Sequence, residues 1–320
     1  MPCYNEEEVL PLTIPAVQSL VERLKADRKI SSRSFALYVD DGSGDATWPL
    51  ISASAEQHPD DCRAMKLAGN VGHQNAILAG MLEAAPDVDC VITIDADLQD
   101  DISAVDAMLD AFAGGSEIVY GVRADRASDS LFKRATASIY YKLMSKLGIK
   151  TIPQHGGFRL VGAAALAALS RYPERNVFLR GIFPSMGFRH ESVFYSRLGR
   201  KAGRTKYPLS KMLSFAWQGI TSFSSQPLRW VSVMGLVVMA LSLLYGLYTI
   251  RMHFLGVTVP GWSTLAAGMF FLGAVQLLSI AVVGEYIAKI YVEVKGRPRY
   301  IREATSWQQE RGKPQDDAAE

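Results

Sequence analysis

Two long runs without a charged residue occupy the last third of the chain, one from Trp230 to Ile250 and one from Gly256 to Gly284. A helix rises 1.5 Å per residue, so the first run would span about 31 Å, which matches the hydrocarbon core of a bilayer. Pro260-Gly261 interrupts the second run, so its helix is expected to begin near Ser263. The pattern predicts two membrane-spanning helices at about 230–250 and 263–287, within an anchor region over 229–290.

Basic residues flank this anchor region on both sides. They are Lys201, Arg204, Lys206, Lys211 and Arg229 before the first span, and Lys289, Lys295, Arg297, Arg299 and Arg302 after the second. The loop between the spans offers only Arg251 and His253. Because basic residues stay on the cytoplasmic side, both ends of the anchor are predicted to face the cytoplasm. Residues 201–228 read as an amphipathic juxtamembrane segment, and residues 291–320 as a cytoplasmic tail that is disordered from Thr305 onward.

Residues 1–200 show a different pattern, in which short apolar runs alternate with amphipathic stretches. The predicted strands are Phe35–Val39, Arg63–Leu67, Cys90–Ile94 and Glu117–Tyr120. The predicted helices are Glu7–Lys25, Trp48–Gln57, His73–Ala85 and Ile102–Ala113. This alternation predicts an α/β domain with a Rossmann-like, mainly parallel sheet, in which ligands bind at the carboxyl ends of the strands.

Composition agrees with two unlike parts. The 320 residues have a mean hydropathy of +0.08, which averages an α/β domain with an apolar anchor. The 49% hydrophobic content excludes a disordered chain, and a net charge of +2 gives no reason to expect a nucleic-acid partner. Three cysteines without metal-ligand spacing favour a reducing, cytoplasm-facing location.

The sharpest candidate chemistry is Asp95-Ala96-Asp97-Leu98-Gln99, at the end of an apolar strand. Two carboxylates and an amide oxygen at alternate positions suit a hard divalent ion, Mg²⁺ or Mn²⁺, that can also hold substrate phosphates. The next two residues, Asp100 and Asp101, are expected to cap the following helix.

A second acidic pair, Asp40-Asp41, also follows an apolar strand. These carboxylates could accept hydrogen bonds from a nucleotide base or ribose. An equally good interpretation is an Asp/Gly/Ser turn with helix capping at Asp45 or Thr47.

Taken together, these motifs resemble the family-two glycosyltransferases of GT-A fold. The matching pieces are Pro2-Cys3-Tyr4-Asn5-Glu6-Glu7, Val39-Asp40-Asp41-Gly42-Ser43, Asn70-Val71-Gly72-His73-Gln74, Asp95-Ala96-Asp97-Leu98-Gln99, Gly121-Val122-Arg123, Phe158-Arg159-Leu160, Pro173-Glu174-Arg175-Asn176 and residues 202–209. With two spans added, the chain resembles bacterial polyprenyl-phosphate hexosyltransferases of the bactoprenol glucosyltransferase branch, which are related to dolichol-phosphate mannose synthase.

The resemblance implies a role for each matching position. Pro2, Tyr4, Glu6, Asp40, Asp41, Asn70 and Asp95 would bind the nucleotide sugar. Asp95, Asp97 and Gln99 would hold the metal, and Arg123 would lie near the donor phosphates or sugar. Arg204, Lys206 and Tyr207 would meet the acceptor phosphate, although juxtamembrane basic residues also bind anionic headgroups without a catalytic task.

The implied reaction is inverting transfer of a hexose to polyprenyl (undecaprenyl) phosphate at the cytoplasmic face of the bacterial inner membrane. UDP-glucose is the favoured donor, and the lipid-linked sugar would serve modification of a cell-envelope glycan. A flippase of the same pathway is an expected partner. Small residues in the second span make a homo-oligomer plausible.

Two positions depart from the family pattern. Relatives usually carry an acidic residue directly before Phe-Arg-Leu, where this chain has Gly157. His155 could replace it as a proton acceptor, although a solvent-facing loop histidine is the more ordinary interpretation. The chain also begins at the Pro-x-Tyr-Asn-Glu motif, which an apolar strand normally precedes. We therefore expect about six to eight further residues upstream of Met1.

Other readings remain open from the sequence. A different donor, of the GDP-mannose or UDP-GlcNAc type, is one of them. Gln226-Pro227-Leu228-Arg229-Trp230 matches the Q-x-x-R-W pattern of processive polysaccharide synthases, although two spans are few for a translocation channel. A non-catalytic membrane anchor that binds a nucleotide sugar is the third.

Overall fold

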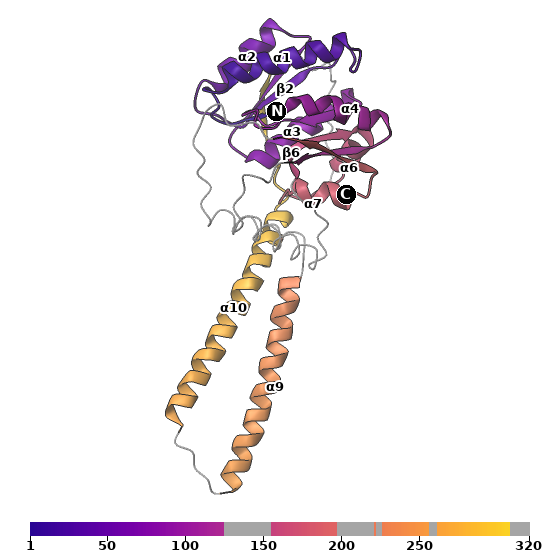
Figure 1. Ribbon diagram of the computed structural model, residues 1–320. Helices are drawn as coiled ribbons and strands as arrows, with labels where there is room; N and C mark the ends of the chain where they lie inside the picture. The colour runs from indigo at the N-terminus through magenta and orange to yellow at the C-terminus, as the bar shows by residue number, and fades with distance from the viewer. Residues whose placement is uncertain (125–154, 197–220, 222–225, 256–260, 308–320) are drawn as a thin grey trace, which may run out of the picture. The chain divides into compact units, whose positions relative to one another are not determined.

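The computed structural model describes residues 1–124, 155–196, 221, 226–255 and 261–307 (Figure 1). Its strands form two four-stranded sheets. In the first, β1 (Pro2–Cys3), β2 (Ala36–Asp40) and β3 (Cys62–Leu67) run parallel, and β8 (Arg302–Thr305) pairs antiparallel with β3. The second has the order β4 (Cys90–Thr93), β6 (His155–Gly162), β5 (Ile118–Arg123) and β7 (His190–Tyr195); β6 is antiparallel to both neighbours, and β5 and β7 are parallel.

Helices cover both faces of the first sheet because side chains alternate along each strand. Tyr38 points to one face, where it packs with Ile51 of α2 (Thr47–Gln57) and Leu10 of α1 (Leu10–Ala26). Its neighbour Val39 points to the other face, where it packs with Ala76 of α3 (His73–Ala84). The predicted α/β architecture is confirmed, with strands and helices close to the expected residues.

A second core lies on the other sheet. Met108 of α4 (Val105–Ala113) packs there with Val119 of β5 and with Phe158 and Leu160 of β6. The helix predicted from Ile102 begins as a short 3₁₀ turn, Ile102–Ala104, and continues as α4. Two short helices, α6 (Ala163–Ser170) and α7 (Leu179–Ser185), follow β6.

A cavity of about 190 Å³ lies between β2 and β4. Apolar residues line it, including Leu37 and Val39 of β2 and Ile92 of β4. The backbone nitrogen of Met1 lies in this region and donates a hydrogen bond to the Leu37 carbonyl oxygen at 2.8 Å. Since β1 pairs with β2 over only two residues, the backbone ladder is interrupted here and the two sheets stay separate.

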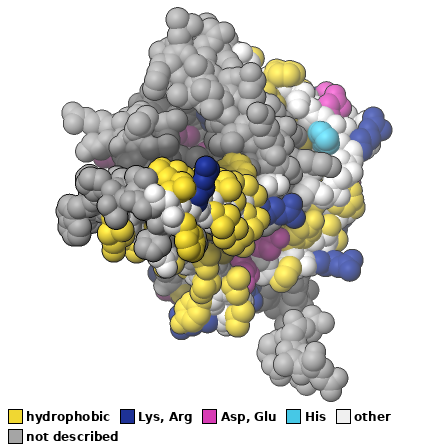
Figure 2. Space-filling view, turned by 90° about the horizontal axis from the view of Figure 1, so that it is seen from below, with side chains coloured by type: hydrophobic (Ala, Val, Ile, Leu, Met, Phe, Trp, Pro, Cys, Tyr) yellow, Lys and Arg dark blue, Asp and Glu magenta, His cyan; other side chains and the backbone are white. Residues whose placement is uncertain are grey.

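The chain divides into two compact units, and the second contains two long helices. These are α9 (Gln226–Phe254, 29 residues) and α10 (Trp262–Val294, 33 residues), both longer than the predicted spans. Within them, Gln226–Tyr248 and Phe271–Val294 have mean hydropathies of 2.0 and 1.7, which makes both helices long and apolar enough to cross a membrane. Their large apolar side chains are exposed, and Figure 2 shows such side chains gathered on this hairpin.

The segment after α10 returns to the first sheet. The sequence predicts disorder from Thr305 onward, but Thr305 pairs with Met65 in the β3–β8 ladder and Trp307 packs against the Val39 cluster. The prediction is therefore wrong for these first residues, because their contacts come from a strand far away in sequence. Residues 308–320 lie outside the described part of the chain.

Candidate active site

The turn after β2 is fastened to the turn after β3 by one carboxylate. Asp41 accepts hydrogen bonds from the backbone amides of Val71 at 2.8 Å and Gly72 at 3.0 Å. Burial raises the pKa of Asp41, and the two amides oppose that rise. A carboxylate that accepts two backbone hydrogen bonds fixes the shape of both turns, so Asp41 has a structural task whether or not it also contacts a nucleotide.

A glycine allows these turns to approach closely. A Cβ placed on Gly42 would lie 2.6 Å from the carbonyl carbon of Gly69 and 2.7 Å from the Asn70 nitrogen, and Gly42 has a φ of +69°. Neighbouring Asp40 is fully buried and accepts a hydrogen bond from the Ser43 amide at 3.1 Å. Its Oδ2 atom has no hydrogen-bond partner among the described residues.

The loop after β1 is held by Asp45 and Thr47, which lie just before and at the first residue of α2. Asp45 accepts hydrogen bonds from the Thr47 amide at 3.0 Å and the Glu7 amide at 3.2 Å. The Thr47 hydroxyl accepts one from the Glu6 amide at 2.8 Å. Asp45 and Thr47 therefore position the Pro-x-Tyr-Asn-Glu loop, whereas the N-cap residue of α2 is Ala46, which makes no side-chain capping hydrogen bond.

Four further predicted nucleotide-binding residues lie around these turns. Tyr4 and Asn70 are exposed, Glu6 is half-buried, and Pro2 is buried within β1. Tyr4 and Glu6 follow the end of β1, and Asn70 follows the end of β3, so the structure places them at one edge of the sheet. Their contact with a nucleotide stays a prediction.

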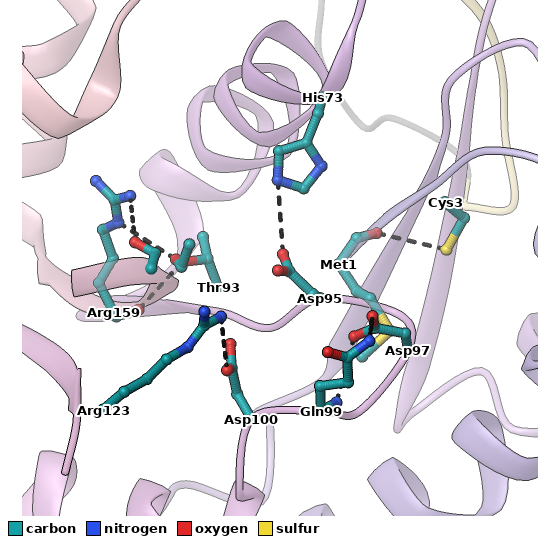
Figure 3. A network of polar contacts seen from close by, with 12 residues as sticks. Met1, Cys3, His73, Thr93, Asp95, Asp97, Gln99, Asp100, Arg123 and Arg159 are labelled. Carbon is teal, nitrogen blue, oxygen red and sulfur yellow. Dashed lines mark hydrogen bonds and ion pairs between the residues drawn. The ribbon is translucent and has the colours of Figure 1, made fainter. Parts of the chain in front are cut away.

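The turn after β4 carries the predicted metal ligands (Figure 3). Leu98 adopts a φ of +44°, which reverses the chain so that Asp97 and Gln99 lie side by side. Asp97 accepts hydrogen bonds from the Gln99 amide at 3.2 Å and from the Gln99 side chain. The Thr13 hydroxyl donates a hydrogen bond to the Ala96 carbonyl oxygen at 2.6 Å, which links this turn to α1.

Asp95 points the other way, toward His73 at the start of α3, with 3.5 Å between Oδ1 and Nε2 (Figure 3). Burial raises the pKa of Asp95, and the nearby charges of Asp100 and Asp97 add to the rise, while His73 and Arg123 oppose it. A nearby cation would stabilise the ionised form of carboxylates that are crowded in this way.

Asp95, Asp97 and Gln99 carry oxygen donors of the kind that a small hard cation prefers. Mg²⁺ is commonly bound by one or two carboxylates together with phosphates and water, and Asp95, Asp97 and the Gln99 amide oxygen supply such oxygens from one turn. Within the described residues, no three His, Cys, Asp or Glu side chains converge on a point that could hold a metal ion. Metal binding by Asp95, Asp97 and Gln99 therefore stays a prediction, and it would need further ligands, such as substrate phosphates, to complete the coordination shell.

Sequence reasoning missed two residues beside this turn. Asp101 does cap the following 3₁₀ turn by accepting from the Ser103 amide at 2.9 Å, but Asp100 does not. Instead, the Asp100 carboxylate is buried and accepts a hydrogen bond from the Tyr195 hydroxyl at 2.6 Å and one from Arg123 at 3.2 Å. The position of Asp100 next to the metal motif was a usable signal, whereas Tyr195 carried none.

The loop that begins β6 approaches the same place without a carboxylate. A Cβ on Gly157 would lie 3.0 Å from Asp95 Oδ1. Fully buried Arg159 holds this loop by donating to the carbonyl oxygens of Gly156, Gly157 and Leu179, and burial lowers its pKa to about 10. His155 is the first residue of β6, and its side chain lies outside the described part of the structure.

The predicted acceptor-phosphate residues, Arg204, Lys206 and Tyr207, lie outside the described residues, as does most of the amphipathic segment 201–228. Their roles stay predictions.

A comparison with known protein families finds a match in the part of the chain that contains this site. The model for glycosyl transferase family 2 matches residues 1–169, which include β1 to β6 and every site turn described above. The chain belongs to glycosyl transferase family 2. It is therefore a glycosyltransferase, as the motifs predicted.

Beyond the family-2 domain, the hairpin α9–α10 matches a second model, the GtrB C-terminal hairpin, over residues 226–290. Relatives match along nearly the whole chain. An uncharacterized glycosyltransferase of Bacillus subtilis, YkoT, is 49% identical over 300 residues, covering 94% of this chain and 89% of the relative. The SfII prophage-derived bactoprenol glucosyl transferase of Shigella flexneri is 37% identical over 303 residues, covering 94% and 95%.

Proposed function

We propose that this family-2 glycosyltransferase transfers a hexose, with glucose from UDP-glucose the favoured case, to polyprenyl phosphate. The observation that carries the proposal is the 37% identity to a bactoprenol glucosyl transferase, which extends through both the catalytic domain and the hairpin. A match to the catalytic domain alone would support sugar transfer without indicating the acceptor. The apolar hairpin supports an acceptor that is itself in the membrane.

On the donor side, we propose that Asp95, Asp97 and Gln99 hold Mg²⁺ or Mn²⁺. When bound, such an ion would supply a Lewis acid for the charge that develops on the leaving diphosphate. Arg123, whose guanidinium lies at the same end of the strands, would add positive charge there. Asp41 would keep the Asn70 turn in shape for the nucleoside, and Asp45 and Thr47 would do the same for the loop of Tyr4 and Glu6.

On the acceptor side, the nucleophile is a phosphate oxygen that is already largely ionised at neutral pH. A strong general base is therefore not required, which is compatible with Gly157 in place of an acidic residue. The task of the protein is to bring two anionic groups together in line, and direct displacement would invert the anomeric carbon. Arg204, Lys206 and Tyr207 are proposed to bind the acceptor phosphate at the cytoplasmic face of the bacterial inner membrane.

The test is a transfer assay on the full-length protein in detergent or vesicles. Undecaprenyl phosphate would be supplied with radiolabelled UDP-glucose, UDP-GlcNAc or GDP-mannose, with Mg²⁺, Mn²⁺ or a chelator. We expect a lipid-linked monosaccharide from UDP-glucose that requires the divalent ion. A product that grows into a polymer, or no lipid product from any donor, would contradict the proposal.

A matched pair of variants links the activity to the turn after β4. Asp97→Asn removes one proposed ligand charge and should abolish transfer. Asp101→Asn makes the same chemical change four residues later, at a residue that only caps a 3₁₀ turn, and should leave transfer in place. Equal loss in both variants would mean that the effect comes from folding.

A further inference from the structure

Asp100 is a buried carboxylate that the proposed reaction does not use. Its side chain is only 2% exposed, and Oδ2 has no hydrogen-bond partner among the described residues. Burying an ionised carboxylate is costly unless charged or polar groups compensate it. The residues that surround Asp100 therefore indicate what it does.

Its two partners come from the ends of two neighbouring strands. Arg123 is the last residue of β5, Tyr195 is the last residue of β7, and the parallel register places them opposite each other. Asp100 Oδ1 accepts from the Tyr195 hydroxyl at 2.6 Å and from the Arg123 guanidinium at 3.2 Å. Arg123 Nε also donates to the Tyr195 hydroxyl oxygen at 3.3 Å, so the three side chains form a closed triangle.

This triangle restrains the Arg123 guanidinium at the edge of the proposed donor site. The Arg123 side chain is 34% exposed, in contrast to Asp100, so the buried pair holds a guanidinium that can still meet a ligand. Figure 3 shows Arg123 and Asp100 close to Asp95, on the strand ends that carry the metal motif. The loop that begins β6 faces this pair. Even a Cβ on Gly156 would lie at ordinary contact distances, 3.4 Å from Arg123 Nη2 and 3.9 Å from Asp100 Oδ2.

We propose that Asp100 and Tyr195 are positioning residues, which fix the Arg123 guanidinium toward the diphosphate of the sugar-nucleotide donor. This inference rests on the proposed function. A long arginine side chain loses much conformational freedom when it binds phosphate, and a preformed triangle removes that cost before the donor arrives. Asp100 and Tyr195 act through Arg123 and need not touch the substrate.

The proposal predicts a specific pattern of kinetic changes. Asp100→Asn keeps the shape and removes the charge, and should raise both the KM and the dissociation constant for the donor about tenfold, the effect of losing one charge-assisted hydrogen bond. Tyr195→Phe should act in the same direction with a smaller size. The matched control Asp101→Asn should leave donor binding unchanged.

The decisive experiment is a double-mutant cycle with Arg123→Gln. Binding of UDP-glucose with Mn²⁺ and transfer to undecaprenyl phosphate would both be measured on the full-length protein. If Asp100 acts through Arg123, adding Asp100→Asn to Arg123→Gln should change the dissociation constant of the donor by less than about twofold. A change of that size lies within the scatter expected for substitutions that act independently. The double variant should also unfold at a higher temperature than Arg123→Gln alone, because it no longer buries an uncompensated carboxylate.

Two results would overturn the inference: an Asp100→Asn effect of the same size in both backgrounds, or no effect in the wild-type background. If Asp100→Asn fails to fold, the cycle of Tyr195→Phe with Arg123→Gln decides the question in the same way. A wild-type protein that binds UDP-glucose without transferring glucose would refute the proposed function, and the binding cycle would still decide this inference. A protein that binds no sugar nucleotide would refute both.

Discussion

Gly157 faces Asp95 so closely that a Cβ on the glycine would lie 3.0 Å from the Asp95 Oδ1 atom. That distance is tighter than ordinary van der Waals contact, so any side chain at position 157 must displace the carboxylate by a few tenths of an ångström. The glycine thus keeps free space beside a proposed metal ligand. Its effect on the site can be measured directly.

Gly157→Ala should weaken the metal dependence of transfer. Moving Asp95 away from its preferred rotamer costs about 0.5–1.5 kcal/mol, so the Mn²⁺ concentration for half-maximal activity should rise about two- to tenfold. Gly156→Ala is the matched control, because its Cβ would meet nothing closer than 3.4 Å, and it should shift the metal requirement less. An unchanged metal titration in Gly157→Ala would show that Asp95 has other room to move.

Gly42→Ala should disturb the nucleotide side of the site. Its Cβ would collide with the backbone of Gly69 and Asn70, and a φ of +69° is unfavourable for alanine. We expect a loss of about 1 kcal/mol or more in the free energy of unfolding and a higher KM for the donor. Gly44→Ala, whose Cβ would meet nothing within 4 Å, is the control, and thermal unfolding with donor titration is the measurement. A stable Gly42→Ala variant with normal donor affinity would contradict this prediction.

The segment after α10 should stabilise the catalytic domain. Trp307 packs against the Val39 cluster, Ser306 exchanges two hydrogen bonds of 2.9 Å with the backbone of Ala64, and Lys66 pairs with Glu303 at 3.0 Å. Trp307→Ala should therefore lower the free energy of unfolding by about 1–3 kcal/mol. Exposed Ile301 lies in the same segment, and Ile301→Ala should have little effect.

A truncation after Gly296 tests the same segment more severely. It would remove β8 and leave β3 as an open edge strand, which is a site for aggregation. We expect the truncated protein to aggregate in size-exclusion chromatography under conditions where the full chain is monodisperse. A monodisperse truncated protein of normal thermal stability would show that β8 is dispensable.

The three cysteines should react slowly in the folded protein. Burial raises the pKa of Cys3 to about 12, that of Cys90 to about 11, and that of Cys62 above its usual value. All three are free thiols, and a raised pKa means less thiolate at pH 8. Iodoacetamide at pH 8 should label them only after unfolding, as judged by intact mass. Because an unfolded thiol ionises near pH 9 and the folded one does not, stability should fall as pH rises above about 9.

Rapid labelling of one cysteine in the folded state would locate a region that opens. Cys90 is only half-buried and borders the cavity between β2 and β4, so it is expected to be the first to react. Labelling of Cys3 before Cys90 would contradict the burial seen here.

Local patterns in the sequence were sufficient for the α/β elements and the two apolar helices, and they also placed the D-x-D-x-Q turn at the end of a strand. Each of these patterns lies within a short stretch of chain: apolar residues that recur every two or 3.6 positions, an uncharged run of more than twenty residues, and the D-x-D-x-Q turn. Such patterns can be recognised without knowing any distant partner. The family resemblance also rested on such local motifs and is confirmed.

Only the tertiary structure decided the rest, because it depends on which strand ends meet. The register of β5 with β7 brings Tyr195 to Arg123 and Asp100, which are separated from it by 72 and 95 residues. The same holds for β8, whose pairing partner lies more than 230 residues earlier and turns a polar tail into a strand. It also holds for the close approach of Gly157 to Asp95, two residues that lie 62 positions apart on different strands' loops, although the sequence alone had marked Gly157 as a departure from the family pattern. Sequence determines such long-range contacts through the packing of the whole domain, and no short window of residues displays them.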